Sequence, residues 1–135
     1  KDSVGATALH ETAFDGHADV AKMLLEAGAD FSAGDSEAFT PLLYAAQEGH
    51  EKVVRLLLDA GADVSASCQN DGTALHMSSR QGHEGVVRML MDAGADAQGE
   101  DVDGNTPLHW ASQEGHPGVV AMLLAAGARV AAADK

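Results

Sequence analysis

Seven histidines are the side chains of this sequence that most readily suggest chemistry, because imidazole nitrogens are common zinc ligands. They form two columns spaced by thirty-three residues or twice that: His10, His76 and His109 in one, and His17, His50, His83 and His116 in the other. If each period is a packed helical unit, equivalent side chains lie roughly 8–10 Å apart, whereas zinc holds its nitrogens at about 2.0–2.1 Å. We therefore predict no metal site. We expect the first column to hydrogen-bond with a threonine three residues earlier and with loop backbone.

Nucleophilic side chains are present but lack the neighbours that activate them. Ser78 and Ser79 follow His76 on one short predicted helix, without a strained turn or an oriented base, so the arrangement of a catalytic triad is missing. We interpret both serines as replacements for alanine in helix packing. Cys68 lies in a loop with aspartates on both sides, whose charges disfavour a thiolate. The sequence therefore predicts no catalytic residue and no enzymatic activity.

The segment 99–104 comes nearest to a phosphate-binding loop. It contains glycines but lacks the required lysine and Ser/Thr, and its acidic residues repel phosphate. The whole chain is acidic as well: it contains 8 Lys and Arg and 21 Asp and Glu, which gives a formal net charge of -13. Such a charge disfavours nucleic acid and anionic membranes as partners. We predict no cofactor, no nucleic-acid partner and no membrane association.

The bulk composition is typical of one soluble domain. The chain has 135 residues, of which 45 % are apolar, enough to build a core. One cysteine excludes an internal disulfide and suits a reducing compartment. The sequence contains no signal-peptide pattern, and its apolar runs are far too short to cross a bilayer. We expect an intracellular protein, in the cytoplasm or the nucleus.

The elements that must position these side chains repeat with a period of thirty-three residues and no insertion or deletion. Four columns show the period: the threonines Thr7, Thr40, Thr73 and Thr106; the leucines Leu9, Leu42, Leu75 and Leu108; the glycines Gly16, Gly49, Gly82 and Gly115, each followed by histidine; and the glycines Gly28, Gly61, Gly94 and Gly127, each followed by alanine. Such a period indicates a stack of small supersecondary units.

The last period shows where helices should begin and end. Thr106 suits a helix N-cap and Pro107 the first helical position, and Gly115 supplies a left-handed stop. Pro117 and Gly127 bound a second helix in the same way. An apolar stripe on this second helix gives each helix pair more apolar surface than it can bury alone. Neighbouring pairs must therefore stack and share a core.

The residues from Asp103 to His109, followed by Gly-His, Val-Val, Leu-Leu and Gly-Ala, resemble the ankyrin repeat over essentially the whole chain. The resemblance implies an all-α solenoid of stacked helix-turn-helix units with projecting hairpin-like loops. It also implies protein binding. The chain departs from the pattern at Leu43, which replaces a histidine, at the Ser78-Ser79 pair, which replaces two alanines, and at Arg129, which replaces an aspartate.

We expect residues 1–135 to form a single domain of four repeats, at about 2–34, 35–67, 68–100 and 101–133. Residues 134–135 would begin a further repeat, because Asp134 falls in the column of Asp35 and Asp101. We therefore expect the parent protein to continue beyond Lys135. Attaching the next repeat should then raise the melting temperature.

The side chains that differ between repeats are the candidates for recognition, since the repeated ones are needed for folding. In ankyrin proteins the contact surface is the loop tips and the exposed part of each first helix, which form a concave groove. Carried over to this chain, that surface predicts the partner-binding residues Val4, Phe14, Asp15, Glu37, Phe39, Tyr44, Gln47, Glu48, Asn70, Arg80, Gln81, Asp103, Asn105, Trp110, Gln113 and Glu114. Their acidity predicts a basic partner, and their aromatic residues are favoured anchors.

Two questions stay open at the level of sequence. Tyr44 and Trp110 occupy a column that either packs between repeats or touches the partner. For function, we predict a monomeric, non-catalytic module that binds a protein or peptide. The alternatives are a structural spacer or intramolecular docking segment of a longer ankyrin array, and an engineered ankyrin binder. Differences at framework positions such as Met89 and Leu43 disfavour the engineered binder.

Overall fold

The computed structural model describes residues 7–70 and 72–127. These residues form eight helices: α1 (Ala8–Asp15), α2 (Ala18–Glu26), α3 (Pro41–Glu48), α4 (Glu51–Ala60), α5 (Ala74–Gln81), α6 (Glu84–Asp92), α7 (Pro107–Gln113) and α8 (Pro117–Ala125). Within the same ranges there is no strand, only an isolated antiparallel bridge between Ser67 and Thr73. The predicted all-α fold of stacked helix-turn-helix units is confirmed.

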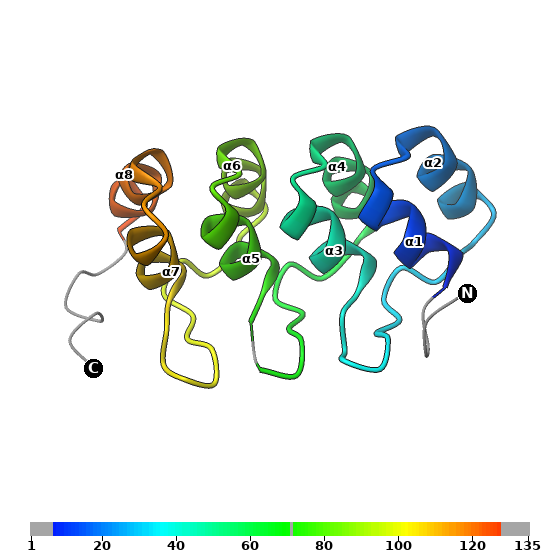
Figure 1. The fold of residues 1–135 in the computed structure, drawn as a ribbon. Coiled ribbons are helices and arrows are strands. Elements are labelled where there is room, and N and C mark those ends of the chain that lie inside the picture. The colour runs from blue at the N-terminus through cyan, green and yellow to red at the C-terminus, as the bar shows by residue number, and fades with distance from the viewer. Residues whose placement is uncertain (1–6, 71, 128–135) are drawn as a thin grey trace.

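The helices form two parallel rows (Figure 1). Helices α1, α3, α5 and α7 pack against one another in one row, and α2, α4, α6 and α8 form the other. Each helix of the first row also packs against the helix that follows it in sequence. The loops 27–40, 61–73 and 93–106 project below the first row, and we call them the first, second and third fingers.

Threonine begins each helix of the first row. Thr7, Thr40, Thr73 and Thr106 are N-caps, and each hydroxyl accepts a hydrogen bond from the backbone N–H three residues on. This satisfies one of the N–H groups that the first turn of a helix leaves without a partner. The threonine column was predicted to cap these helices, and the structure confirms it.

Glycine is the C-cap of α1, α3 and α5, while in α7 the C-cap is Glu114 and the glycine, Gly115, comes one residue later. Two physical reasons favour glycine here, and Gly49 illustrates both. Its φ is 77°, in the left-handed region that side chains with a Cβ rarely adopt. A Cβ at Gly49 would also lie 2.6 Å from Nδ1 of His83, on the neighbouring helix pair. The glycine therefore allows both the sharp turn and the close approach of the next pair.

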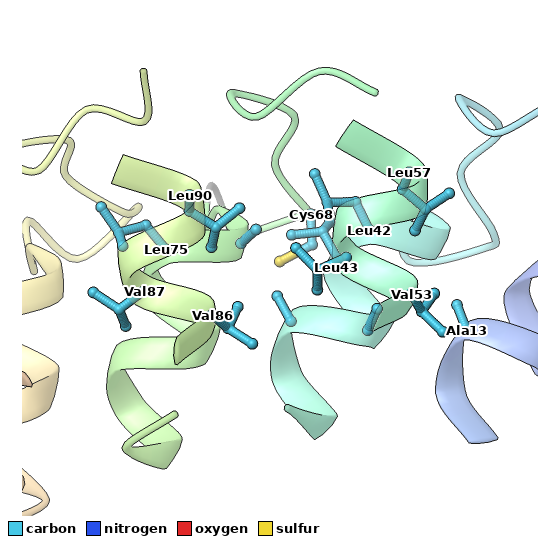
Figure 2. Packing of buried hydrophobic residues seen from close by; sticks show 14 of the residues in the cluster. Ala13, Leu42, Leu43, Val53, Leu57, Cys68, Leu75, Val86, Val87 and Leu90 are labelled. Carbon is cyan, nitrogen blue, oxygen red and sulfur yellow. The ribbon is translucent and has the colours of Figure 1, made fainter. Parts of the chain in front are cut away.

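The core lies between the two rows and runs continuously through the stack (Figure 2). Leu57 of α4 and Leu75 and Leu90 of the next pair are fully buried, as are the valines Val53, Val54, Val86 and Val87. The side chains of one pair meet those of the next, so every pair buries its apolar stripe against a neighbour. Stability is thus shared between units and their interfaces.

The two serines of α5 replace alanine in this core, as predicted. Ser78 and Ser79 are both fully buried. Ser78 Oγ donates to the carbonyl oxygen of Ala74 at 3.0 Å. Within the described residues, Ser79 Oγ has no hydrogen-bond partner. Ser79 therefore buries a hydroxyl group without compensation, which destabilises this position relative to alanine.

Candidate protein-binding surface

The finger tips and the exposed sides of α1, α3, α5 and α7 form one continuous surface, which we call the finger–helix surface (Figure 1). Its shape depends on three sets of hydrogen bonds: those of the histidines, those within the finger tips, and those between neighbouring fingers.

Two histidines of the first column, His10 and His76, join a helix start to the following finger. The Thr7 backbone N–H donates to Nδ1 of His10 at 3.1 Å, so this nitrogen carries no proton. Nε2 therefore holds the proton and donates to the Phe39 carbonyl oxygen at 2.9 Å. His76 repeats the arrangement, with Nε2 at 2.9 Å from the Asn105 carbonyl oxygen. The predicted bonds to threonine and loop backbone are confirmed.

The second histidine column links neighbouring helix pairs, a role that the sequence analysis did not assign. In three of its four members, Nε2 lies 2.9–3.0 Å from a carbonyl oxygen near the end of a first-row helix in the preceding pair: His50 from that of Phe14, His83 from that of Gln47, and His116 from that of Arg80. The separation of thirty-six residues recurs each time. That regularity was present in the sequence, but only the stacking geometry shows which carbonyl each ring meets.

Metal binding is the other chemistry that histidines suggest. Across residues 7–70 and 72–127, no three side chains of His, Cys, Asp or Glu lie close enough together to hold a metal ion. Both ring nitrogens of His10 and His76 are engaged in the hydrogen bonds described above. Those two imidazoles act as fixed connectors of the scaffold.

An aspartate holds the tip of the first finger. Oδ1 of Asp35 accepts hydrogen bonds from the backbone N–H groups of Glu37 and Phe39, each at 3.0 Å. Oδ2 accepts from the hydroxyl of Tyr44 on α3. Burial raises the pKa of Asp35, but these three donors outweigh it and hold the pKa below its usual value. Burial and the Asp35 carboxylate together raise the pKa of Tyr44 to about 12.

The third finger is held in the same way by Asp101. Its Oδ1 accepts from the backbone N–H groups of Asp103 and Asn105, and its Oδ2 from Nε1 of Trp110 at 3.0 Å. Burial raises the pKa of Asp101, and the donors outweigh that effect, so the pKa is again lowered. Tyr44 and Trp110 thus do equivalent work. Both are half-buried, so each supports a finger while part of its ring still faces solvent.

The second finger uses different chemistry. Cys68 and Met77 replace the aspartate and the aromatic residue found at the equivalent positions of the other two fingers. Oδ1 of Asn70 accepts instead, from the Cys68 thiol at 2.8 Å and from the Gly72 backbone N–H at 3.1 Å. Cys68 is buried. The second finger thus lacks both members of the aspartate–aromatic pair, and the Asn70 side chain binds the backbone of its tip instead.

The fingers are also joined to one another along their backbones. The Gln69 N–H donates to the Glu37 carbonyl oxygen at 3.1 Å, and the Val102 N–H donates to the Asn70 carbonyl oxygen at 2.8 Å. The Gln69 side chain adds a bond to the Ser36 carbonyl oxygen at 3.0 Å. Bonds between fingers fix their spacing, so the finger–helix surface is a preformed one.

Aromatic side chains gather at the end of this surface formed by α1, α3 and the first finger. The Tyr44 ring lies 5.9 Å from the Phe14 ring in an edge-to-face contact and 4.9 Å from the Phe39 ring. Phe14 is 46 % exposed although it belongs to this cluster. An exposed aromatic ring held edge to face by another is an apolar anchor of the kind found at protein interfaces.

A second aromatic feature lies towards the other end, on α5 and α7. The guanidinium carbon of Arg80 lies 4.9 Å from the centre of the Trp110 ring, the geometry of a cation–π contact. The two residues fall in different columns of the period. Only the stacking of α5 against α7 brings them together.

All the predicted contact residues that the structure describes keep some exposure. Nine are exposed: Phe14, Asp15, Glu37, Asn70, Arg80, Gln81, Asp103, Gln113 and Glu114. Six are half-buried: Phe39, Tyr44, Gln47, Glu48, Asn105 and Trp110. Val4 lies outside the described residues. The predicted contact residues carry five carboxylates but only one guanidinium, that of Arg80. The carboxylates belong to Asp15, Glu37, Glu48, Asp103 and Glu114.

A stack of helix pairs with projecting fingers defines a helical repeat protein. A family model described as "Ankyrin repeats (3 copies)" matches residues 1–68 and again residues 64–134. The chain belongs to the ankyrin repeat family. Ankyrin repeats are generally protein–protein interaction modules and are typically non-catalytic. No curated protein matches the chain.

Membrane insertion needs a long apolar helix. In the part of the chain that the structure describes, no helix combines the length and the apolar character that a membrane crossing requires.

Proposed function

We propose that this chain is a non-catalytic module that binds a partner protein or peptide on its finger–helix surface, and that the bound segment is basic. The observation that supports the proposal is the contrast between frame and surface. Frame residues repeat and are tied together by hydrogen bonds, whereas exposed residues on that frame, such as Phe14 and Arg80, differ from repeat to repeat. A rigid surface loses little conformational entropy on binding.

Charge supports a basic partner. Carboxylates outnumber basic side chains on this surface, and the formal net charge of the chain is -13. Opposite charges steer association and favour the correct orientation, and salt screens them over about 10 Å at 0.1 M. Binding should therefore weaken as the salt concentration rises.

We further propose the organisation of the chain: one monomeric domain, residues 1–135, of four repeats at about 2–34, 35–67, 68–100 and 101–133. One helix pair and one N-cap threonine fall in each of these segments. We also propose that the protein works inside the cell.

Affinity capture from a cell lysate tests the function. Beads would carry the wild-type chain, a surface variant (Phe14→Ala, Asp15→Asn, Glu114→Gln) or a control variant (Asp59→Asn, Asp92→Asn). The control removes two exposed carboxylates, as the surface variant does, but from α4 and α6. Circular dichroism would first establish that all three fold.

The proposal predicts basic proteins that the wild type and the control retain and that the surface variant loses, with capture weakened in high salt. If the surface variant and the control retain the same proteins, or if no protein is retained specifically, the proposal is wrong. A structural spacer or intramolecular docking segment would give the empty result.

A further inference from the structure

A small cavity opens on the finger–helix surface between the second and third fingers. Its volume is about 30 Å³, and it is lined by Asn70, His76, Met77, Arg80, Asp101 and Trp110. A water molecule needs about 10–15 Å³ of such volume, so the cavity has room for one small polar group. Its lining is about equally polar and apolar, and the free hydrogen-bonding groups decide which polar group fits.

Most acceptor positions of this lining are already used. Both ring nitrogens of His76 are engaged, with Thr73 and with the Asn105 carbonyl oxygen. Asp101 accepts hydrogen bonds on both carboxylate oxygens. What the lining still offers must therefore be sought among its donors.

Two donors remain. The Gly72 N–H donates to Oδ1 of Asn70, which identifies the oxygen of that amide and leaves its NH₂ group as a donor. The Arg80 guanidinium has five N–H donors in a planar fork. In the described part of the chain no carboxylate forms an ion pair with it, and its contact is the face of Trp110 at 4.9 Å. A guanidinium attracted to the face of an aromatic ring can still donate hydrogen bonds from its N–H groups.

Arg80 is also held at its backbone. Its carbonyl oxygen accepts a hydrogen bond from Nε2 of His116 at 2.9 Å. With its main chain fixed by the next helix pair and its head group on an indole ring, the arginine loses less entropy when it binds a ligand than a free side chain would.

We propose that the Arg80–Asn70–Trp110 cavity binds one carboxylate of the partner, the side chain of an Asp or Glu within an otherwise basic segment. This rests on the proposed function. Arginine binds carboxylates through two parallel hydrogen bonds, which fix position as well as charge. Asp101 lines the same cavity, but its carboxylate already accepts three hydrogen bonds from its own finger and from Trp110, whereas the guanidinium of Arg80 has no carboxylate partner among the described residues. The surrounding carboxylates still attract the basic residues on either side.

The only tryptophan of the chain reports on this cavity, because Trp110 lines it. Random peptides displayed on phage would be selected on the wild-type chain, and the binders synthesised. Each peptide would then be titrated against the protein, with binding followed by Trp110 fluorescence and confirmed by calorimetry.

We expect the selected peptides to share one Asp or Glu among basic residues. Changing it to Asn or Gln, or changing Arg80→Gln, should weaken binding about tenfold, the size of one charge-assisted bond. The two changes together should cost little more than either alone, because they remove the same interaction. Arg88→Gln, an exposed arginine of α6, is the charge-matched control and should leave affinity unchanged.

Two results would overturn the proposal, and they differ in what else they overturn. Peptides that need Phe14 and Asp15 but tolerate both Arg80→Gln and loss of their carboxylate would contradict the carboxylate site and leave the proposed function standing. Failure to select any peptide that depends on the finger–helix surface would contradict both.

Discussion

In two fingers, an aspartate at the tip bonds to an aromatic side chain nine positions further along the chain. Asp35 with Tyr44, and Asp101 with Trp110, each close a finger tip onto a helix. Cys68 and Met77 replace such a pair together in the second finger. An aromatic residue in this column therefore supports the finger and still stays partly exposed.

Tyr44→Phe tests that support without altering the ring. The variant removes the hydroxyl that donates to Asp35, a half-buried carboxylate. We expect the free energy of unfolding to fall by about 1–2 kcal/mol, because a bond to a charged group is lost. Urea unfolding followed by circular dichroism measures the change. In an Asp35→Asn background the same substitution should cost clearly less, and an equal cost would show that the hydroxyl acts otherwise.

The buried His76 makes stability depend on pH. Burial lowers its pKa from 6.5, more than the Asn105 carbonyl raises it. Below about pH 6.5 the unfolded chain takes up a proton on this histidine before the folded chain does, so stability falls as the pH falls. Above that value the contribution is fully present.

Urea midpoints measured between about pH 7.5 and 5.5 check this direction. His76→Gln is the matched variant, since glutamine at this position also completes a capping box. Its stability should depend less on pH than that of the wild type. Equal slopes for the two proteins would mean that His76 titrates alike in the folded and unfolded states.

Ser79 offers a gain in stability. Its hydroxyl is fully buried, and among the described residues nothing pairs with it. We expect Ser79→Ala to raise the free energy of unfolding by about 1 kcal/mol. Ser78→Ala is the control, because the Ser78 hydroxyl donates to the Ala74 carbonyl oxygen and its loss should bring no such gain. A destabilised Ser79→Ala would mean that this hydroxyl has a partner in solution.

Residue roles of this kind were only partly predictable. The threonine–histidine bonds followed from a three-residue spacing repeated along the chain. The Arg80–Trp110 contact did not, because these residues lie in different columns and meet only when α5 packs on α7. Whether Tyr44 packs or stays exposed depends on neighbours from another helix pair, and it does both.

At the scale of elements, the ends of the helices could be predicted from the sequence, whereas the conformations of the finger tips could not. N-cap threonines and left-handed glycines mark helix ends locally, so their positions could be read directly. A finger tip depends on which side chain reaches its backbone N–H groups. Asp35 and Asn70 solve that problem differently at tips of the same length. The period alone could not predict this difference.

The first finger contains a backbone conformation that its residue does not favour. Ala38 has a φ of 66°, and the equivalent residue of the third finger is Gly104, with a φ of 81°. A left-handed conformation costs a residue with a Cβ about 1–2 kcal/mol, and glycine avoids this cost. Glycine also has greater conformational freedom in the unfolded chain, which offsets part of the stabilisation. We expect Ala38→Gly to stabilise the protein by up to about 1 kcal/mol.

Thermal and urea unfolding would measure the effect of Ala38→Gly. Ala66→Gly, in the second finger, is the control, because Ala66 has no positive φ and should lose stability on substitution. If both glycine variants lose stability to the same extent, the first finger is not strained at Ala38.

At the scale of the whole molecule, the stack separates folding from recognition. Buried valines and leucines and two histidine columns hold one helix pair against the next. Exposed side chains on the first-row helices and fingers are left free to differ. Membership of the ankyrin repeat family agrees with this division, since such repeats generally bind proteins.

The same division explains what the sequence could say about the surface. Positions that vary inside a constant frame indicated where a partner would bind, and the structure leaves every described one of them at least partly exposed. The frame carries no information about the partner. Its chemistry has to be inferred from side chains such as Phe14 and Arg80, which occur in one repeat only.

The most direct test of the central claim is hydrogen–deuterium exchange of the chain with and without a captured partner or selected peptide. We predict that binding protects backbone amides of the finger tips and of α1, α3, α5 and α7, and leaves α2, α4, α6 and α8 unchanged. Protection confined to the second-row helices would contradict the claim that the finger–helix surface is the binding site.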